Sequence, residues 1–502
     1  MARLTRLLLF TTTAALTLAG PTNHTEKRAT KNDKEVLILG GGVAGIIAAR
    51  TLFEKNVKNF LVVEARDELG GRMRSMEFGG HTVELGANWI QGTQHGSGPA
   101  NPIYTLAKKH GLKTMESDYF GSIETFDETG KVNYTKTLMD AVAAFTDLTI
   151  AAGARVPTQQ VDLNCRTGYS LIGKKPKTPA EKVTEYFLFD WEHAQTPEQS
   201  SWIASAWGNN FTYNVNEGGF SDDNLLCVDP RGFKHIIKSE ADEFLKPEQT
   251  LLNATVAKIA YSDDGVVVTL SNGTRITADY AITTFSVGVL QQDDVIFEPA
   301  LPMWKQEAIQ STKMATYTKL FLQFEKKFWF DTQFALYADK VRGRYPVWQS
   351  LDMEGFLPGS GIIFATVTGD WSEAIESLTN DQVEAQLLSV LRTMFPTIDI
   401  PKPKAFFFQR WFTDPLYRGS YSNWPASLVT PHHMNLRANV GKRLWFAGEA
   451  TSQKYVGFLQ GAYFEGMDAG NNVASCVVSG GKQCQSLPFA ESIPNASPYV
   501  PQ

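Results

Sequence analysis

The 502-residue sequence has little cysteine and histidine, four and eight residues respectively, and they form no CxxC motif, Cys/His cluster or metal-ligand spacing. We therefore expect no metal and no Cys–His nucleophile. The formal net charge is −6, so the chain also lacks the excess of Lys and Arg that would attract nucleic acid or an anionic membrane surface. Its length and its hydrophobic share of 43% instead predict a well-packed globular protein with two large domains.

The only apolar run at the N-terminus, LLLFTTTAALTLAG, is too short to span a bilayer. Arg3 and Arg6 precede it, an order typical of a secretory signal peptide. We predict that residues 1–28 hold this signal and a short propeptide, with Lys27-Arg28 either a dibasic processing site or a solvated charge pair. Motifs for N-glycosylation agree with a secreted protein and begin at Asn23, Asn133, Asn210, Asn253, Asn272 and Asn495.

Export places the four cysteines in an oxidising compartment. Cys165, Cys227, Cys476 and Cys484 make an even number, which predicts two disulfides with three possible connectivities. The tail after residue 477 contains one of these cysteines and has no hydrophobic anchor.

Residues 35–64 carry the most informative motif. The strand EVLIL runs directly into Gly40-x-Gly42-x-x-Gly45, a helical segment follows, and a second strand, FLVV, ends at Glu64. This order is a βαβ unit with a dinucleotide-binding fingerprint, in which the glycines admit a pyrophosphate and the acid binds ribose hydroxyls. The cofactor residues predicted in this unit are Gly40, Gly42, Val43, Ala44, Gly45 and Glu64.

Three further motifs favour FAD over NAD. Gly70-Gly71-Arg72 adds a close backbone approach and a cation aimed at phosphate, and VELGANWIQG follows at residues 83–92. Near the C-terminus, LWFAGEATSQKYVGFLQGAYFEGMDAG indicates a strand, Gly448-Glu449, a loop and a glycine-rich helix. Together these motifs resemble the flavin-containing amine oxidase family, most closely the secreted plant and fungal polyamine oxidases.

The resemblance extends from Glu35 to Ser475 and implies a two-domain α/β flavoprotein. A discontinuous, glutathione-reductase-like FAD-binding domain would comprise residues 34–112, 229–304 and 418–477. An α+β substrate-binding domain with a mixed sheet would comprise residues 113–228 and 305–417, and residues 478–502 would form a C-terminal tail. The family pattern implies non-covalent FAD, no metal, and cofactor contacts at Arg72, Ala87, Asn88, Trp89, Val256, Trp411, Glu449, Gly457 and Phe458.

One lysine stands in an unusual context. In YTKLFLQF, a strand with period two, Lys319 shares a face with Tyr317 and Phe321. Lysine is almost never fully buried without a partner, and burial should lower its pKa. The resemblance implies that Lys319 is catalytic and lies near N5 of the flavin, bridged by a water molecule.

A polyamine is a string of methylenes and cationic nitrogens, so its site should combine aromatic walls with carboxylates. The resemblance implies substrate contacts at Gln91, Glu192, His193, Tyr317 and Tyr421. Asp190, two residues before Glu192 on a helix, cannot face the same way. Two departures from the plant enzymes, Gln91 for Glu and Phe458 for Tyr, leave the preference among spermine, spermidine and acetylated polyamines open.

The predicted function is a secreted FAD-dependent polyamine oxidase, a monomer or weak dimer without nucleic-acid or membrane partners. It would convert a polyamine and O2 into an amino-aldehyde, a shorter amine and hydrogen peroxide. One alternative is another FAD amine oxidase. The monoamine type is disfavoured because no cysteine lies between Cys227 and Cys476, and the L-amino-acid type because Arg410 and Arg418 match no family clamp position. The other alternative is a flavin-binding protein without turnover.

Overall fold

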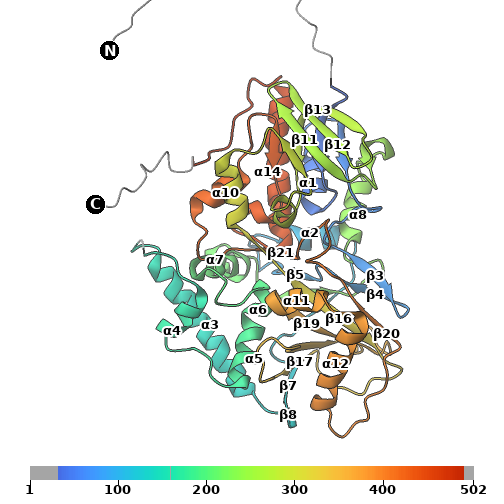
Figure 1. Ribbon diagram of the computed structural model, residues 1–502, viewed down its shortest axis with the longest axis vertical. Coiled ribbons are helices and arrows are strands. Elements are labelled where there is room, and N and C mark those ends of the chain that lie inside the picture. Colours follow the sequence, from blue (N-terminus) through green and yellow to red (C-terminus); the bar gives the residue numbers. More distant parts are fainter. Residues whose placement is uncertain (1–31, 159, 491–502) are drawn as a thin grey trace, which may run out of the picture.

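The computed structural model describes residues 32–158 and 160–490. The predicted signal peptide and the glycosylation motifs at Asn23 and Asn495 lie outside these residues. Two mixed sheets organise the chain, and Figure 1 shows one in the upper half of the molecule and the other in the lower half. Both combine strands with covering helices, as expected for an α/β flavoprotein.

The upper sheet has eight strands from distant parts of the sequence, in the order β10-β2-β1-β13-β12-β11-β14, with β22 also pairing with β13. Parallel pairings connect β10 to β2, β2 to β1, β1 to β13 and β13 to β22. An antiparallel meander is formed by β11, β12 and β13. The strands are β1 (Lys34–Leu39), β2 (Phe60–Val63), β10 (Thr250–Leu251), β11 (Val256–Ser262), β12 (Gly265–Leu270), β13 (Arg275–Thr283), β14 (Ile296–Glu298) and β22 (Leu444–Phe446). Because parallel strands are covered on both faces, β2 and most of β1 are apolar and buried.

Helices α1 (Val43–Glu54) and α14 (Leu459–Val478) pack together on this sheet. Glycines make the contact possible: a Cβ atom on Gly466 would lie 2.3 Å from the carbonyl oxygen of Ala44. The first and last helices of the described chain are therefore neighbours (Figure 1). The other elements of this half are α2 (Pro102–Lys109), α8 (His235–Asp242), η2 (Pro247–Gln249), α9 (Val287–Leu290), α10 (Met303–Ser311), α13 (Thr430–Arg437) and η3 (Glu449–Thr451).

The lower sheet has seven strands in the order β20-β16-β19-β18-β17-β7-β8. They are β7 (Ile123–Asp127), β8 (Gly130–Val132), β16 (Tyr317–Gln323), β17 (Phe334–Tyr337), β18 (Val347–Ser350), β19 (Ile362–Thr368) and β20 (Ala405–Phe408). The helices around it are α3 (Thr135–Arg155), α4 (Cys165–Leu171), α5 (Pro179–Leu188), α6 (Asp190–His193), α7 (Trp202–Tyr213), α11 (Gly369–Glu376) and α12 (Asn380–Met394), with η1 (Val215–Glu217) after α7. The period-two reading of β16 is confirmed, since Leu320 and Leu322 pack in one core and Phe321 in another.

Small strand groups join the two halves where the cavity described below lies. β21 (Tyr421–Asn423) pairs with β15 (Lys313–Ala315), and β9 (Asn224–Cys227) pairs with both β5 (Trp89–Gln91) and β6 (Thr114–Glu116). A hairpin of β3 (Ser75–Phe78) and β4 (His81–Glu84) precedes β5. These short pairings hold segments from both ends of the chain against β16.

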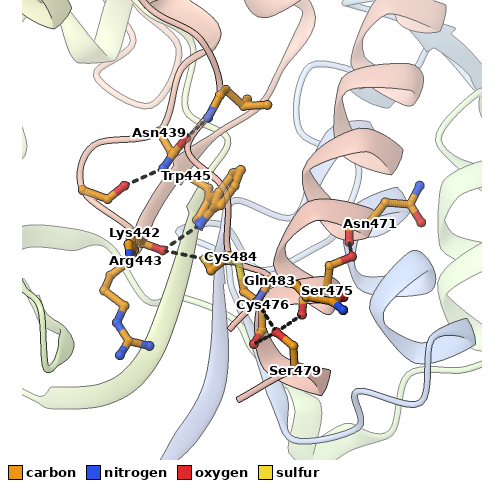
Figure 2. Close-up of a disulfide and its surroundings, with 12 residues drawn as sticks. Asn439, Lys442, Arg443, Trp445, Asn471, Ser475, Cys476, Ser479, Gln483 and Cys484 are labelled. Carbon is orange, nitrogen blue, oxygen red and sulfur yellow. Dashed lines mark hydrogen bonds between the residues drawn. A yellow bond between two sulfur atoms is a disulfide. The ribbon is translucent and has the colours of Figure 1, made fainter. Parts of the chain in front are cut away.

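The expectation of two disulfides is wrong for the described residues. Cys476 and Cys484 form one disulfide, whereas Cys165 and Cys227 are free and buried in separate cores. Figure 2 shows the bridge beside β22: the main-chain carbonyl of Lys442 accepts a hydrogen bond from the indole of Trp445 at 3.2 Å and contacts the Cys484 sulfur at 3.5 Å. The start of the C-terminal tail is therefore attached to the upper half.

By length and composition, α3 is the one helix among the described residues that is long and apolar enough to cross a membrane. Its buried residues Ala144, Leu148 and Ala152 pack with Phe189 and Trp202 of the neighbouring helical segments. This apolar side is thus used in the core of the lower half.

Candidate active site

A cavity of about 690 Å³ extends from the end of β1 to helices α6 and α7. Segments from both halves and from both ends of the described chain line it. Of the predicted site residues, all but Gly45 line this cavity. A Cβ atom on Gly45 would lie 1.9 Å from the carbonyl oxygen of Gly40, so this glycine is required for packing between β1 and α1. The structure thus gives Gly45 a role in packing, and its contact with the cofactor stays a prediction.

The first end of the cavity is the glycine turn after β1. Gly40 has φ of +113°, a conformation that favours glycine, and its N–H bonds the Val63 carbonyl at 2.8 Å. The Glu64 carboxylate at the end of β2 accepts a hydrogen bond from the Gly41 N–H at 2.7 Å. The N-terminus of α1 has no side-chain cap, which leaves its first N–H groups free to bind an anion.

The predicted cation Arg72 has a partner that the sequence did not reveal. Its guanidinium donates to the Glu449 carboxylate at 2.8 Å and to the Ser420 carbonyl at 2.9 Å. Glu449 also accepts hydrogen bonds from the Ser422 hydroxyl at 3.0 Å and the Gly457 N–H at 2.9 Å. This network ties the loop before α14 to Arg72 and to the segment around Ser422, and both Arg72 and Glu449 remain in the cavity wall.

The central part of the cavity runs between β5 and β16. Its wall includes Ala87, Asn88 and Trp89 on one side, with Trp411 and Phe458 from later in the chain. The side-chain oxygen of Asn88 is buried and has no hydrogen-bond partner among the described residues. Buried polar atoms are normally paired, so this oxygen indicates a bound group that supplies a donor.

Lys319 is only 2% exposed, and two carbonyl groups explain its position. Its Nζ donates to the Glu84 carbonyl at 3.0 Å and to the Gly86 carbonyl at 2.8 Å, and lies 5.2 Å from the centre of the Trp89 ring. Burial lowers the pKa of Lys319 to about 7, although the nearby Glu84 carboxylate opposes this shift. The amine can therefore hold or release a proton near neutral pH.

The other end of the cavity contains the Glu192 carboxylate on α6. Gln91 Nε2 donates to it at 3.3 Å and the Tyr213 hydroxyl approaches it at 3.5 Å, while the Tyr421 hydroxyl donates to the Glu192 carbonyl at 2.9 Å. Burial raises the pKa of Glu192 to about 7. Asp190 points elsewhere, as expected, and forms a two-bond ion pair with Arg342 at 2.6 Å.

His193 follows Glu192 on the same short helix and also lines the cavity. Its ring centre lies 4.5 Å from that of Phe189, and burial lowers the pKa of the imidazole to about 4. The side chain is therefore neutral at pH 7. Its Nε2 atom is buried and has no partner among the described residues.

Several lining residues were missed from the sequence: Tyr119, Trp191, Ser205, Asn209, Ser422 and Trp424. Trp191 adjoins Glu192, and its ring lies 5.3 Å from that of Tyr119 and 5.4 Å from that of Trp89. The dense aromatics of YFLFDWEH were a usable signal for Trp191. Tyr119 and Trp424 carry no such signal because distant strands bring them to the cavity.

Comparison with known proteins agrees with this geometry. Residues 43–474 match the family described as flavin containing amine oxidoreductase, and the chain belongs to that family. It is thus an FAD-dependent amine oxidoreductase. Polyamine oxidase 1 of Zea mays is 33% identical over 464 residues, covering 88% of this chain and 90% of the relative. Polyamine oxidase 6 of Oryza sativa subsp. japonica is 33% identical over 460 residues, covering 88% of this chain and 90% of the relative.

The fold is also that of a known structure. A solved structure of a putrescine oxidase redesigned in its cofactor binding aligns with a TM-score of 0.70 and 17% identity, over 88% of this chain and 99% of its own. The residues present suit FAD: the uncapped N-terminus of α1 suits a pyrophosphate, Glu64 suits a ribose, and the unpaired Asn88 oxygen suits an N–H donor. No cysteine lines the cavity among the described residues, which is consistent with non-covalent binding.

Proposed function

We propose that this protein is a secreted polyamine oxidase that acts as a monomer or weak dimer. It oxidises the carbon next to an amine nitrogen of spermine, spermidine or an acetylated form. When bound, FAD would supply the acceptor for the hydride from that carbon and the route of the two electrons to O2, with hydrogen peroxide as product; hydrolysis of the substrate imine by water would give an amino-aldehyde and a shorter amine.

A single observation carries the proposal: Glu192 and Lys319 line the same cavity as the cofactor residues. A carboxylate can bind a cationic nitrogen of the substrate, and an amine with a lowered pKa can move a proton near neutral pH. Aromatic rings stand between them, with ring centres of Tyr317 and Tyr421 6.2 Å apart and of Trp191 and Tyr317 6.4 Å apart. Methylenes and cationic nitrogens both bind well to such walls.

Glu192 is the group that binds an ammonium. In its ionised form it offers charge-assisted hydrogen bonds to the substrate. The Gln91 amide takes one hydrogen-bond position on a carboxylate oxygen of Glu192 and keeps the Glu192 side chain facing the cavity. Because the pKa of Glu192 is about 7, a bound ammonium also stabilises the ionised carboxylate.

Lys319 acts at the opposite wall. As an ammonium it has three N–H bonds, two of which are taken by the carbonyls of Glu84 and Gly86. The third can donate to a water molecule in the cavity. As a neutral amine, Lys319 keeps both carbonyl bonds and presents a lone pair instead, so Nζ can move one proton without changing its position.

The structure gives no support to an L-amino-acid oxidase. Arg410 donates to the Leu378 carbonyl at 3.0 Å, and Arg418 pairs with Asp294 at 2.9 Å. Neither guanidinium lines the cavity. A carboxylate clamp would need a free guanidinium at the Glu192 end, where the described lining contains none.

The proposal of export is supported by the surface. Asn133, Asn253 and Asn272 are exposed, and Asn210 is partly exposed. Mass spectrometry of protein purified from the medium of the producing cells tests this part. A mature N-terminus within residues 1–28 or directly after them, downstream of the apolar run, and glycans at these asparagines are expected; an intact Met1 in cell extracts only would contradict export.

Anaerobic bleaching of the flavin absorbance tests the activity. The panel is spermine, spermidine, N1-acetylspermine, benzylamine and L-leucine, with product identification by mass spectrometry. Rapid bleaching by a polyamine is expected. Bleaching by benzylamine or L-leucine alone would move the enzyme to another branch of the family, and no bleaching at all would leave a flavin-binding protein without turnover.

A further inference from the structure

Glu192 stands on an element that is too short to hold its own direction. α6 is a single turn: Phe189 separates it from α5, and Ala194 ends it with φ of +54°, a conformation that favours glycine. Short isolated helices are unstable, so contacts with the rest of the fold must keep this turn in place. The direction of the Glu192 side chain therefore depends on what anchors α6.

The anchor on the side away from the cavity is Arg342, in the loop 338–346 between β17 and β18. Its guanidinium donates two hydrogen bonds to the Asp190 carboxylate, each at 2.6 Å, and one to the Glu185 carboxylate at 2.8 Å. Glu185 belongs to the last turn of α5, so one side chain bridges the two helices across Phe189. Because Asp190 and Glu192 are two positions apart in α6, holding the first fixes the second on another side of the turn.

This bridge belongs to a row of alternating charges that is buried at its α6 end. Arg166 of α4 donates two hydrogen bonds to Glu185, at 2.6 and 2.7 Å, and one to Glu198 at 2.6 Å. Asp190 and Glu185 are only 1% and 4% exposed. Burial raises the pKa of Asp190 to about 6, and the Arg342 guanidinium opposes this rise. Arg342 thus supplies the counter-charge that connects α6 to the row.

Arg342 is itself held against the lower sheet. Its Cζ atom lies 5.6 Å from the centre of the Tyr186 ring, and the Tyr186 hydroxyl accepts a hydrogen bond from the Thr368 N–H at 2.9 Å. Thr368 is the last residue of β19, which pairs with β16, and its partner there is Tyr317 in the cavity wall. The contacts of Arg342 therefore relate the position of α6 to the strand that carries Lys319.

Stability does not explain the use of ions here. Exchange of a buried ion pair for apolar residues of similar volume is often neutral or stabilising, whereas the planar fork of a guanidinium fixes the direction of its partners. Neither Arg342 nor Asp190 lines the cavity. Any effect of these two residues on substrate binding must therefore act through α6.

We propose that Arg342 is a positioning residue for the substrate: by joining Asp190 to Glu185, it keeps the Glu192 carboxylate in place relative to β16. This inference rests on the proposed function and goes beyond it, to a residue outside the cavity that sets substrate affinity. Without the bridge, α6 can turn, and the carboxylate no longer meets the substrate ammonium while the amine is oxidised.

Anaerobic reduction of the flavin in the intact holoenzyme tests the proposal, with spermine, spermidine and N1-acetylspermine at about pH 8, where Glu192 is ionised. Stopped-flow absorbance gives the limiting rate of reduction and the apparent Kd for each amine. For Arg342→Gln we expect the Kd to increase about tenfold or more and the limiting rate to stay within about twofold. An unchanged Kd would overturn this inference and leave the proposed function standing. Failure of all three amines to reduce the flavin of the unaltered enzyme would instead overturn the proposed function.

A double-mutant cycle separates positioning from general structural damage. If Arg342 acts through Glu192, Arg342→Gln should raise the Kd by less than about twofold in a Glu192→Gln background. Equal increases in both backgrounds would mean that Arg342 acts independently of Glu192, and the inference would be wrong. Flavin content is measured on the same samples, and a fall in flavin content with an unchanged Kd would also overturn it.

Two further variants keep the test decisive if Arg342→Gln does not fold. Arg342→Lys keeps the charge but lacks the planar fork, so its Kd should lie between those of the unaltered enzyme and Arg342→Gln. Asp190→Asn removes one charge of the bridge and should raise the Kd in the same direction. The matched control is Arg344→Gln in the same loop, whose ion-pair partner Asp339 lies outside the cavity. Its Kd should equal that of the unaltered enzyme, and an unchanged Kd in both Arg342→Lys and Asp190→Asn would overturn the assignment.

Discussion

The Nζ atom of Lys319 donates to the main-chain carbonyl of Glu84 at 3.0 Å, while the carboxylate of the same Glu84 is turned away from the cavity. That carboxylate accepts hydrogen bonds from the Ser75 hydroxyl and the Phe233 N–H, each at 2.7 Å. The lysine is thus held by neutral carbonyls, and the Glu84 carboxyl group, whose pKa is raised by burial, lies near it without forming an ion pair. This arrangement lets the amine change its charge state without losing its position.

Replacement of Lys319 by Met should slow flavin reduction or reoxidation by about 10²-fold, because the positioned proton donor and acceptor is lost. FAD should stay bound, since Lys319 is not part of the glycine turn or the Glu449 network. Stopped-flow absorbance under anaerobic conditions and then with O2 separates the two steps. Lys326→Met, an exposed change just after the same strand, is the control. If Lys319→Met reduces and reoxidises its flavin at unaltered rates, Lys319 is not the proton donor and acceptor assigned here.

The pH profile should report Glu192. Because its pKa is raised to about 7, the carboxyl is protonated below that pH and loses its attraction for an ammonium. We expect kcat/KM to rise as the pH increases through about 7. Glu192→Gln should lower kcat/KM by about 10-fold to 100-fold at high pH and remove the part of this rise that Glu192 causes. Glu217→Gln, at an exposed position, should leave the profile unchanged; a rise that persists in Glu192→Gln would mean that another group titrates.

The ion pair between Arg72 and Glu449 should control retention of FAD. Glu449→Gln removes a charge that bonds Arg72, Ser422 and Gly457, so the loop before α14 loses its anchor. We expect the Kd for FAD to increase at least about tenfold. The ratio of absorbance by flavin to that by protein, and titration of the apoprotein, measure the change. Arg344→Gln disrupts the ion pair with Asp339 outside the cavity and should not alter FAD content.

Removal of the disulfide should affect stability rather than chemistry. Cys476 and Cys484 are eight residues apart, and closure of so short a loop is worth roughly 2–3 kcal/mol. Cys484→Ser should lower the free energy of unfolding by about this amount, as measured by urea titration, with kcat unchanged. In a thiol assay on the denatured but unreduced protein, Cys165 and Cys227 should react as free thiols. Cys476 and Cys484 should react only after reduction. Four reactive thiols before reduction would contradict the bridge.

The sequence predicted those parts of the site that depend on local order. The turn at Gly40, the acid at Glu64 and the strand face of Lys319 follow from glycine conformations and from period two, and no knowledge of distant contacts is needed. The helical segment expected between the two strands is also present, as α1 from Val43 to Glu54.

The parts that depend on pairing across the fold were not predictable. Arg72 looked like a free cation because its partner Glu449 is 377 residues away. The free state of Cys165 and Cys227 follows from their separate cores, which an even count of cysteines does not reveal. The packing role of Gly45 was not separable from a pyrophosphate approach in the sequence, because both require a glycine at the same position.

The upper half is completed by β22 and α14, which are synthesised last among its elements. Residues near 40 and near 449 must meet before the cofactor cavity has two walls, and they emerge from the ribosome far apart in time. A nascent chain made only to about residue 440 has the glycine turn but neither Glu449 nor the start of α14. Loading of FAD must therefore wait until the residues around Glu449 and the start of α14 have been made, and a truncation before Glu449 removes one wall of the cofactor site.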